Sequence, residues 1–153
     1  MDKQQLLETA KLIKTVRNAT ATEYLTKAEQ ITNRMNTLML ERADLMNLIG
    51  ENNTDMMKDN HANHVRFIGS ILKNYNPEVF VDTVLWVFRA YRSRGFTTNY
   101  WAALLNTSIN ALKEIISPEN YNEIFLYYQW LQVNIPTFVA LSDEQLNHSN
   151  SLN

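Results

Sequence analysis

Two histidines in the segment "DNHANHVRFIGSIL", residues 59–72, are the side chains best suited to chemistry. His61 and His64 are three positions apart, so a helix would place both on one face together with Ile68. Two imidazoles on neighbouring turns suit a metal site, a phosphorylated histidine or a buried polar pair. No recognisable catalytic motif accompanies them, and we predict no catalytic residue.

The surroundings of the pair favour the buried reading. No Asp or Glu follows on the same helical face as a further metal ligand, and His148 lies far away in a polar C-terminal segment. A phosphoacceptor histidine must be exposed, whereas this helical phase points both rings inward, with His61 nearer the helix start and therefore more accessible. Burial should hold the pKa of His64 below its ordinary value of about 6.5. We predict no metal and no cofactor.

A ligand pocket is the sharper alternative to simple burial. Pockets for small molecules are mostly apolar and contain a few placed polar groups. The candidate ligand-binding residues are therefore His61 and His64 as polar groups, with Ile68 and Trp86 as walls. A small apolar molecule or an anion would fit this description.

The elements that must position these residues are predicted to be helices. Only three glycines and three prolines interrupt 153 residues, which favours a mostly helical chain. Apolar residues at a 3-4 spacing predict one long helix over residues 6–49, or two joined at "NATAT" (18–22). Further helices are expected over 54–75, 77–93 and 98–116, and from "SPEN" (117–120) to about 135, with caps at Asn76 and Ser117 and a stop at Gly95.

The predicted fold class is an all-α single domain. We expect an N-terminal helical segment over residues 1–50, a helical core over 54–141 and a flexible tail over 142–153. The helix over 77–93 is apolar nearly all round, which is typical of a central helix. The last long helix has a second apolar face made of Leu126, Trp130 and Val133, and we predict that this face, the N-terminal seam or both form a homodimer interface.

Composition and charge exclude several classes of function. The net charge is −2 and no basic stripe emerges, so a nucleic-acid partner is not expected. The chain has no cysteine, which excludes thiol nucleophiles and thiolate metal sites. The N-terminus is polar and no apolar run reaches the roughly 20 residues of a membrane span, so we expect a cytoplasmic protein.

The stretch "DNHANHVRFIGSILKNYNPEVFVDTVLWVFRAYRSRGF" resembles the helical region beside the cobalamin-binding domain of many bacterial regulators. The positions that carry the resemblance are Asp59, His64, Phe67, Ile68, Pro77, Phe80, Trp86, Arg94 and Gly95. The chain is also similar to haem-free globin-like sensor domains of stress and sporulation signalling. The cobalamin-binding Asp-x-His-x-x-Gly motif is missing. The resemblance implies a globin-like, dimeric sensory or adaptor module.

The leading hypothesis is a non-enzymatic regulatory protein of bacterial signalling. It would bind a partner protein, and a small apolar or anionic ligand in the core around His64 and Trp86. The alternative is a small metal- or cofactor-dependent helical enzyme that uses His61 and His64. A structural dimer without a ligand is a third hypothesis.

Overall fold

The computed structural model describes the backbone of residues 1–152 and the side chains of residues 1–144. This part of the chain forms nine helices and no strand, which confirms the all-α fold class. The helices are α1 Lys3–Ala10, α2 Asn18–Thr26, α3 Ala28–Leu40, α4 Leu45–Ile49, α5 Thr54–Lys73, α6 Pro77–Arg92, α7 Thr98–Ile115, α8 Pro118–Val133 and α9 Ile135–Leu152.

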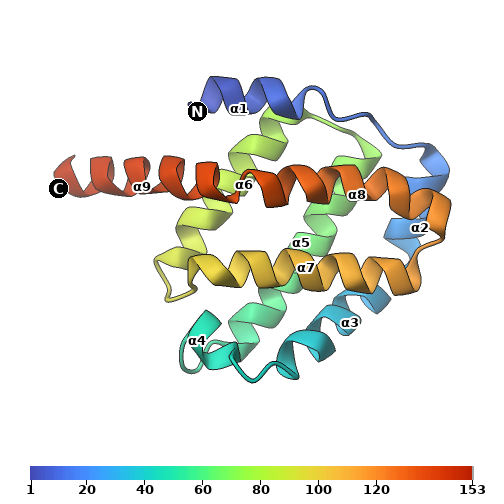
Figure 1. The fold of residues 1–153 in the computed structure, drawn as a ribbon, viewed down its shortest axis with the longest axis horizontal. Coiled ribbons are helices and arrows are strands. Elements are labelled where there is room, and N and C mark those ends of the chain that lie inside the picture. The colour runs from blue at the N-terminus through green and yellow to red at the C-terminus, as the bar shows by residue number, and fades with distance from the viewer. Residues whose placement is uncertain (153) are drawn as a thin grey trace.

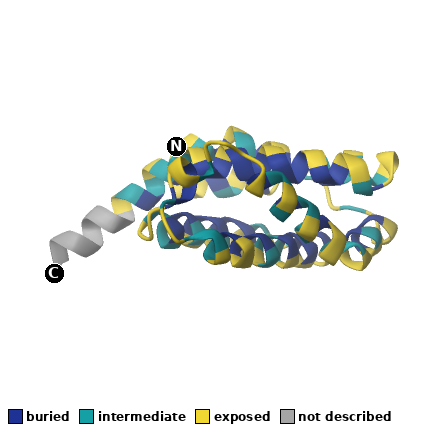
Figure 2. Cartoon of the chain, turned by 90° about the horizontal axis from the view of Figure 1, so that it is seen from below, coloured by how far each residue is buried: buried dark blue, intermediate teal, exposed yellow. Residues whose placement is uncertain are grey.

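The helices are arranged in two layers. Helices α7 and α8 are antiparallel neighbours, and α9 continues almost end to end from α8 (Figure 1). Helices α5 and α6 cross behind them in the same view. Helix α3 packs on both α5 and α7, and α2 packs on α5 and α8. The buried residues face the space between the layers, whereas exposed residues cover their outer sides (Figure 2).

The N-terminal segment differs from the expected long helix or helix pair. Residues 3–49 form four helices, and residues 11–17 are not helical. The "NATAT" segment begins α2 instead of breaking a helix, because the backbone N–H and side chain of Arg17 are held by Glu123 of α8. The predicted apolar spacing nevertheless marks the buried side, since Leu6, Tyr24 and Met35 are all enclosed.

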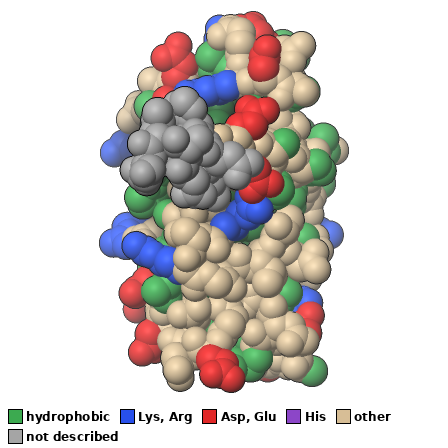
Figure 3. Space-filling model, turned by 90° about the vertical axis from the view of Figure 1, so that its left-hand side faces the viewer, with side chains coloured by type: hydrophobic (Ala, Val, Ile, Leu, Met, Phe, Trp, Pro, Cys, Tyr) green, Lys and Arg blue, Asp and Glu red, His purple; other side chains and the backbone are tan. Residues whose placement is uncertain are grey.

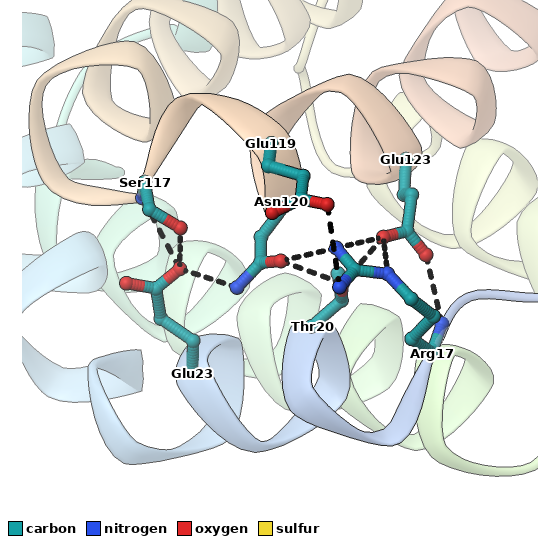
Figure 4. A network of polar contacts seen from close by, with 7 residues as sticks. All are labelled: Arg17, Thr20, Glu23, Ser117, Glu119, Asn120 and Glu123. Atoms are coloured by element: carbon teal, nitrogen blue, oxygen red, sulfur yellow. Dashed lines mark hydrogen bonds and ion pairs between the residues drawn. The ribbon is translucent and has the colours of Figure 1, made fainter.

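Seven polar residues join α2 to the start of α8 (Figure 4). Arg17, Thr20 and Glu23 come from the N-terminal side; Ser117, Glu119, Asn120 and Glu123 come from the other. The Glu23 carboxylate accepts hydrogen bonds from the Ser117 backbone N–H (3.1 Å) and hydroxyl (2.8 Å), and from Asn120 Nδ2 (2.9 Å). Ser117 was expected to cap α8 itself, but its hydroxyl donates to Glu23, so a carboxylate from α2 occupies the positive end of α8.

Other helix ends follow the sequence closely. The Asn76 side chain accepts a hydrogen bond from the Val79 N–H at 3.2 Å and caps α6. Gly50 and Gly95 adopt φ angles of 81° and 98°, a region that favours glycine. Asn53 Nδ2 donates to the carbonyls of Ile49 and Arg94, which ties the two glycine turns together below the start of α5.

Helix α6 is not central on every side, contrary to expectation. Val79 is 49% exposed and Trp86 is 58% exposed, so α6 presents an apolar outer face. Its close backbone neighbours are α1 and α9, whereas it stands farther from α5 and α7. The inner side of α6 is partly packed, as at Phe80, whose ring lies 4.9 Å from that of Trp130, and partly borders a cavity, as at Val84.

The C-terminal region expected to be a flexible tail begins inside α9. Ser142 is buried, and Asp143 forms a 2.7 Å ion pair with Arg92 of α6. The side chain of His148 lies outside the described residues. Residues 142 and 143 thus belong to the packed core region rather than to a separate tail.

Candidate ligand-binding site

A cavity of about 220 Å³ occupies the space between α5, α6 and α7. Leu131 of α8 and Phe138 of α9 close its far side. An apolar cavity of about 150 Å³ is large enough to hold benzene, so this one has room for a substituted single ring. Its lining includes no Lys, Arg, Asp or Glu and consists mainly of apolar and aromatic residues, namely Phe67, Ile68, Val84, Trp86, Val87, Phe88, Tyr91, Trp101, Leu104, Leu105, Leu131 and Phe138, with Asn60, Asn63, His64 and Thr83 as the polar members.

Three of the four predicted ligand-binding residues lie in this wall. His64 and Ile68 contribute from α5 and Trp86 from α6, so the structure brings together residues 18 to 22 positions apart in the chain. Ile68 is fully buried, whereas Trp86 lies at the solvent side of the cavity with more than half of its surface exposed. His61 does not line the cavity.

His61 instead faces α3. Its Nδ1 donates a hydrogen bond to Asn36 Oδ1 at 2.6 Å, and its Nε2 is buried without a partner. We expected His61 to be the more accessible of the two histidines, but the ring is completely enclosed because α3 packs over the start of α5. Burial lowers the pKa of His61 to about 4.

His64 is the polar group that connects the cavity to α8. Its Nε2 shares a 2.8 Å hydrogen bond with the Tyr128 hydroxyl, and the two rings meet edge to face at 5.6 Å. Burial, helped by repulsion from His61, lowers the pKa of His64 to about 3. The predicted inward orientation and the predicted direction of the pKa shift both agree with the structure. The imidazole is therefore neutral at pH 7.

Several wall residues were not foreseen as part of a site. Trp101, Leu104 and Leu105 form the α7 wall, and Phe138 contributes from α9. In the sequence they form part of ordinary amphipathic stripes, which do not distinguish a cavity wall from a filled core. Asn60, one turn before His64, donates from Nδ2 to the Tyr100 hydroxyl at 2.6 Å, and nothing in the sequence pattern marked that pair.

The two histidines do not converge on a common point. His61 bonds to α3 and His64 to α8, and among the residues that the structure describes no three His, Asp or Glu side chains lie close enough to hold a metal ion. The arrangement is that of two separate buried polar links from α5 to its neighbours.

The predicted interface residues divide into two kinds. Leu126 is 41% exposed and Val133 is 70% exposed, as an interface requires. Trp130 is only 7% exposed, so its predicted role as a surface anchor is wrong. Helix α1 covers it: Trp130 Nε1 donates to Thr9 Oγ1 at 2.9 Å, and its ring lies 4.9 Å from that of Phe80.

The visible surface near the C-terminal helix carries charges of both signs. On this face Lys and Arg side chains are intermixed with Asp and Glu, and hydrophobic side chains are scattered (Figure 3). No helix in the described part of the chain combines the length and the apolar character needed to cross a membrane.

The fold and site define an all-helical protein with a mainly apolar cavity that opens to solvent near Trp86 and has neutral polar groups in its wall. The chain matches no protein-family model, and no curated protein or solved structure is significantly similar to it. The resemblance to helical regions of bacterial regulators therefore stays a hypothesis.

Proposed function

We propose that this protein is a non-enzymatic, cytoplasmic regulatory protein that binds a small uncharged apolar ligand in the cavity between α5 and α6. The observation that carries the proposal is the cavity itself: about 220 Å³ of space, open to solvent near Trp86, which aromatic and aliphatic side chains line without a charged residue among those that the structure describes. A globin-like sensory module belongs to the same proposal, supported by the crossing of α7 and α8 over α5 and α6 (Figure 1).

The polar wall favours an uncharged ligand over an anionic one. An anion buried beside His64 needs a cationic imidazole. Because burial and repulsion from His61 lower the pKa of His64 in the free site to about 3, the anion would have to supply the free energy of protonation that a neutral ligand does not need. Without a compensating positive charge, an apolar cavity binds neutral molecules in preference to charged ones.

A route from ligand to partner runs through α8. His64 touches the cavity on one side and the Tyr128 hydroxyl on the other, and Tyr128 lies on the helix that exposes Leu126 and Val133. A ligand that displaces His64 would therefore change how α8 packs against α5. In this proposal the exposed face of α8 binds a signalling partner or a second copy of the chain.

Filling the cavity tests the proposal. α-Methylstyrene, a neutral hydrocarbon of suitable size, should raise the melting temperature of the wild-type protein and perturb the NMR signals of Ile68 and Val84. The variant Val84→Phe should fill the cavity and abolish these effects. The matched control Val79→Phe, on the outer face of the same helix, should leave them intact.

If α-methylstyrene has no effect on the wild-type protein at saturating concentration, the proposed cavity function is wrong. If the probe does bind, mass spectrometry of the molecules that co-purify with the wild-type protein but not with Val84→Phe would identify the class of the natural ligand.

A further inference from the structure

The indole N–H of Trp101 is buried in the cavity wall region without a hydrogen-bond acceptor. Trp101 lines the cavity, the residue is 4% exposed, and its Nε1 has no partner among the side chains of residues 1–144 or the described backbone. Buried indole N–H groups normally find a partner, because leaving such a donor unpaired costs its full desolvation. This donor is an unusual feature in an otherwise apolar wall.

The other two tryptophans of the chain show the contrast. Trp130 Nε1 donates to Thr9 Oγ1 at 2.9 Å, and Trp86 is 58% exposed. Trp101 is thus the tryptophan whose N–H is both enclosed and unpaired. Its ring stacks on that of Phe88 at 4.5 Å and meets that of Tyr100 edge to face at 5.2 Å.

Three other polar side chains in the cavity wall have hydrogen-bond partners, whereas the hydroxyls of Thr83 and Tyr91 lie in the same wall. His64 Nε2 shares its hydrogen bond with Tyr128, Asn60 Nδ2 donates to Tyr100, and Asn63 Oδ1 accepts from Arg66. Trp101 Nε1 is the buried donor of this wall that has no partner, and because the atom itself has almost no accessible surface, the indole must turn slightly for a bound molecule to accept its hydrogen bond. Phe88, on which Trp101 stacks, lines the same cavity, so an aromatic ligand ring would lie among aromatic neighbours.

Within the function proposed above, on which it rests, we infer that the ligand is an uncharged ring compound with one hydrogen-bond acceptor, such as a ketone or ether oxygen, that accepts from Trp101 Nε1. The absence of charged residues from the lining excludes a strong preference for carboxylates. A fixed donor in a mainly apolar wall specifies position and orientation: the apolar body fills the space beside Ile68 and Leu105, and the oxygen turns toward α7.

A thermodynamic cycle tests this assignment. Acetophenone and α-methylstyrene have nearly the same shape, but only the ketone carries an acceptor. We would measure the dissociation constants of both by NMR titration for the wild-type protein, Trp101→Phe and the control Trp86→Phe. For each protein we would form the ratio of the two constants. The probes differ in desolvation cost, but this difference is the same for all three proteins and cancels when their ratios are compared.

The preference for acetophenone, expressed as this ratio, should fall about five- to tenfold in Trp101→Phe, as expected for one lost hydrogen bond. It should stay unchanged in Trp86→Phe, which alters the wall at an exposed position. Benzoate, the anionic analogue, should bind more weakly than acetophenone to every variant.

Three results would overturn the assignment, and they separate it from the proposed function. Equal ratios in all three proteins, with both probes bound, would show that Trp101 Nε1 is satisfied within the protein, for example by the face of Tyr100; the cavity function would then survive. Tighter binding of benzoate would exclude an uncharged ligand. Failure of both neutral probes to bind would reject the proposed function and the assignment together.

A wild-type measurement decides the matter if Trp101→Phe fails to fold. Acetophenone should move the Trp101 indole N–H resonance downfield. With α-methylstyrene, the resonance should shift only by the ring-current effect that both probes share. Identical shifts with the two probes would contradict a hydrogen bond to the ligand.

Discussion

At the scale of single residues, the two histidines of α5 make stability depend on pH. Burial lowers the pKa of His61 to about 4 and that of His64, with the repulsion of His61, to about 3, whereas both are near 6.5 when the chain is unfolded. The unfolded state therefore binds more protons below pH 6.5. The full stability is present above that value and is lost as the pH falls toward 4 and 3.

The expected loss between pH 7 and pH 5 is on the order of 2–4 kcal/mol of the free energy of unfolding for the two histidines together. Urea unfolding at the two pH values measures it. The double variant His61→Gln and His64→Gln should show a much smaller difference. Glu23→Gln is the control, since the carboxyl group of Glu23 titrates below this range and its loss should not change the difference. An equal pH dependence in wild type and double variant would show that the histidines are solvated.

At the scale of helices, the start of α8 depends on a carboxylate from α2. Glu23 accepts from Lys27, from the N–H and hydroxyl of Ser117, and from Asn120. These contacts, the Lys27 hydrogen bond foremost, outweigh burial and lower the pKa of Glu23 to about 2 from an ordinary 4.5. The stabilisation is present above pH 4.5 and is lost as the pH falls through about 2.

Glu23→Gln should lower the free energy of unfolding at pH 7 by about 1–2 kcal/mol, because a charged acceptor at a helix N-terminus is replaced by a neutral amide. Chemical denaturation measures the change. Glu119→Gln is the matched control: its side chain is 82% exposed and lies 3.6 Å from Arg17, so a change below about 0.5 kcal/mol is expected. Similar effects from both substitutions would contradict a specific role for Glu23.

The helices also show what sequence patterns can and cannot predict. Caps and stops act locally, so Asn76 and Gly95 were predicted correctly. The breaks at residues 11–17 and at Lys27 depend on distant partners such as Glu123 and Ile115, which lie far along the chain and leave no local signal. Gly69 lies between these cases: the glycine is visible in the sequence, but the close approach of Leu25 from α2, whose Cδ2 would lie 2.7 Å from an added Cβ, is not.

The candidate site was predictable on one helix and not across the others. Helical phase identified His64 and Ile68 as inward-facing, but it placed His61 in the same site. The phase of α5 alone does not tell which inward-facing residues contact α3, as His61 does, and which face the cavity beside α6. Whether inward-facing residues meet other side chains or a cavity depends on how far α6 stands from α5 and α7. That spacing is a property of the packed molecule.

At the scale of the whole molecule, α8 has one apolar side enclosed and one partly open. Trp130 is enclosed by α1 and packs against Phe80 and Phe138, so it belongs to the core of the folded chain. Leu126 and Val133 are seven positions apart, two turns along the same helix, and both are exposed. A homodimer, as proposed, would therefore use Leu126 and Val133 in a symmetric contact and leave Trp130 in place.

Two glutamate substitutions separate the dimer surface from the core. Val133→Glu should leave the far-UV circular dichroism spectrum and the cooperative unfolding transition intact and shift the protein from dimer to monomer in analytical ultracentrifugation, because the charge faces the partner rather than the core. Trp130→Glu should instead cost more than about 4 kcal/mol and abolish cooperative unfolding, since it removes a buried aromatic ring and its hydrogen bond to Thr9 and buries a charge. A wild-type protein that remains monomeric at several hundred micromolar would reject the dimer. A folded Trp130→Glu monomer would show instead that α1 lifts away from α8, and that Trp130 is available to a partner after all.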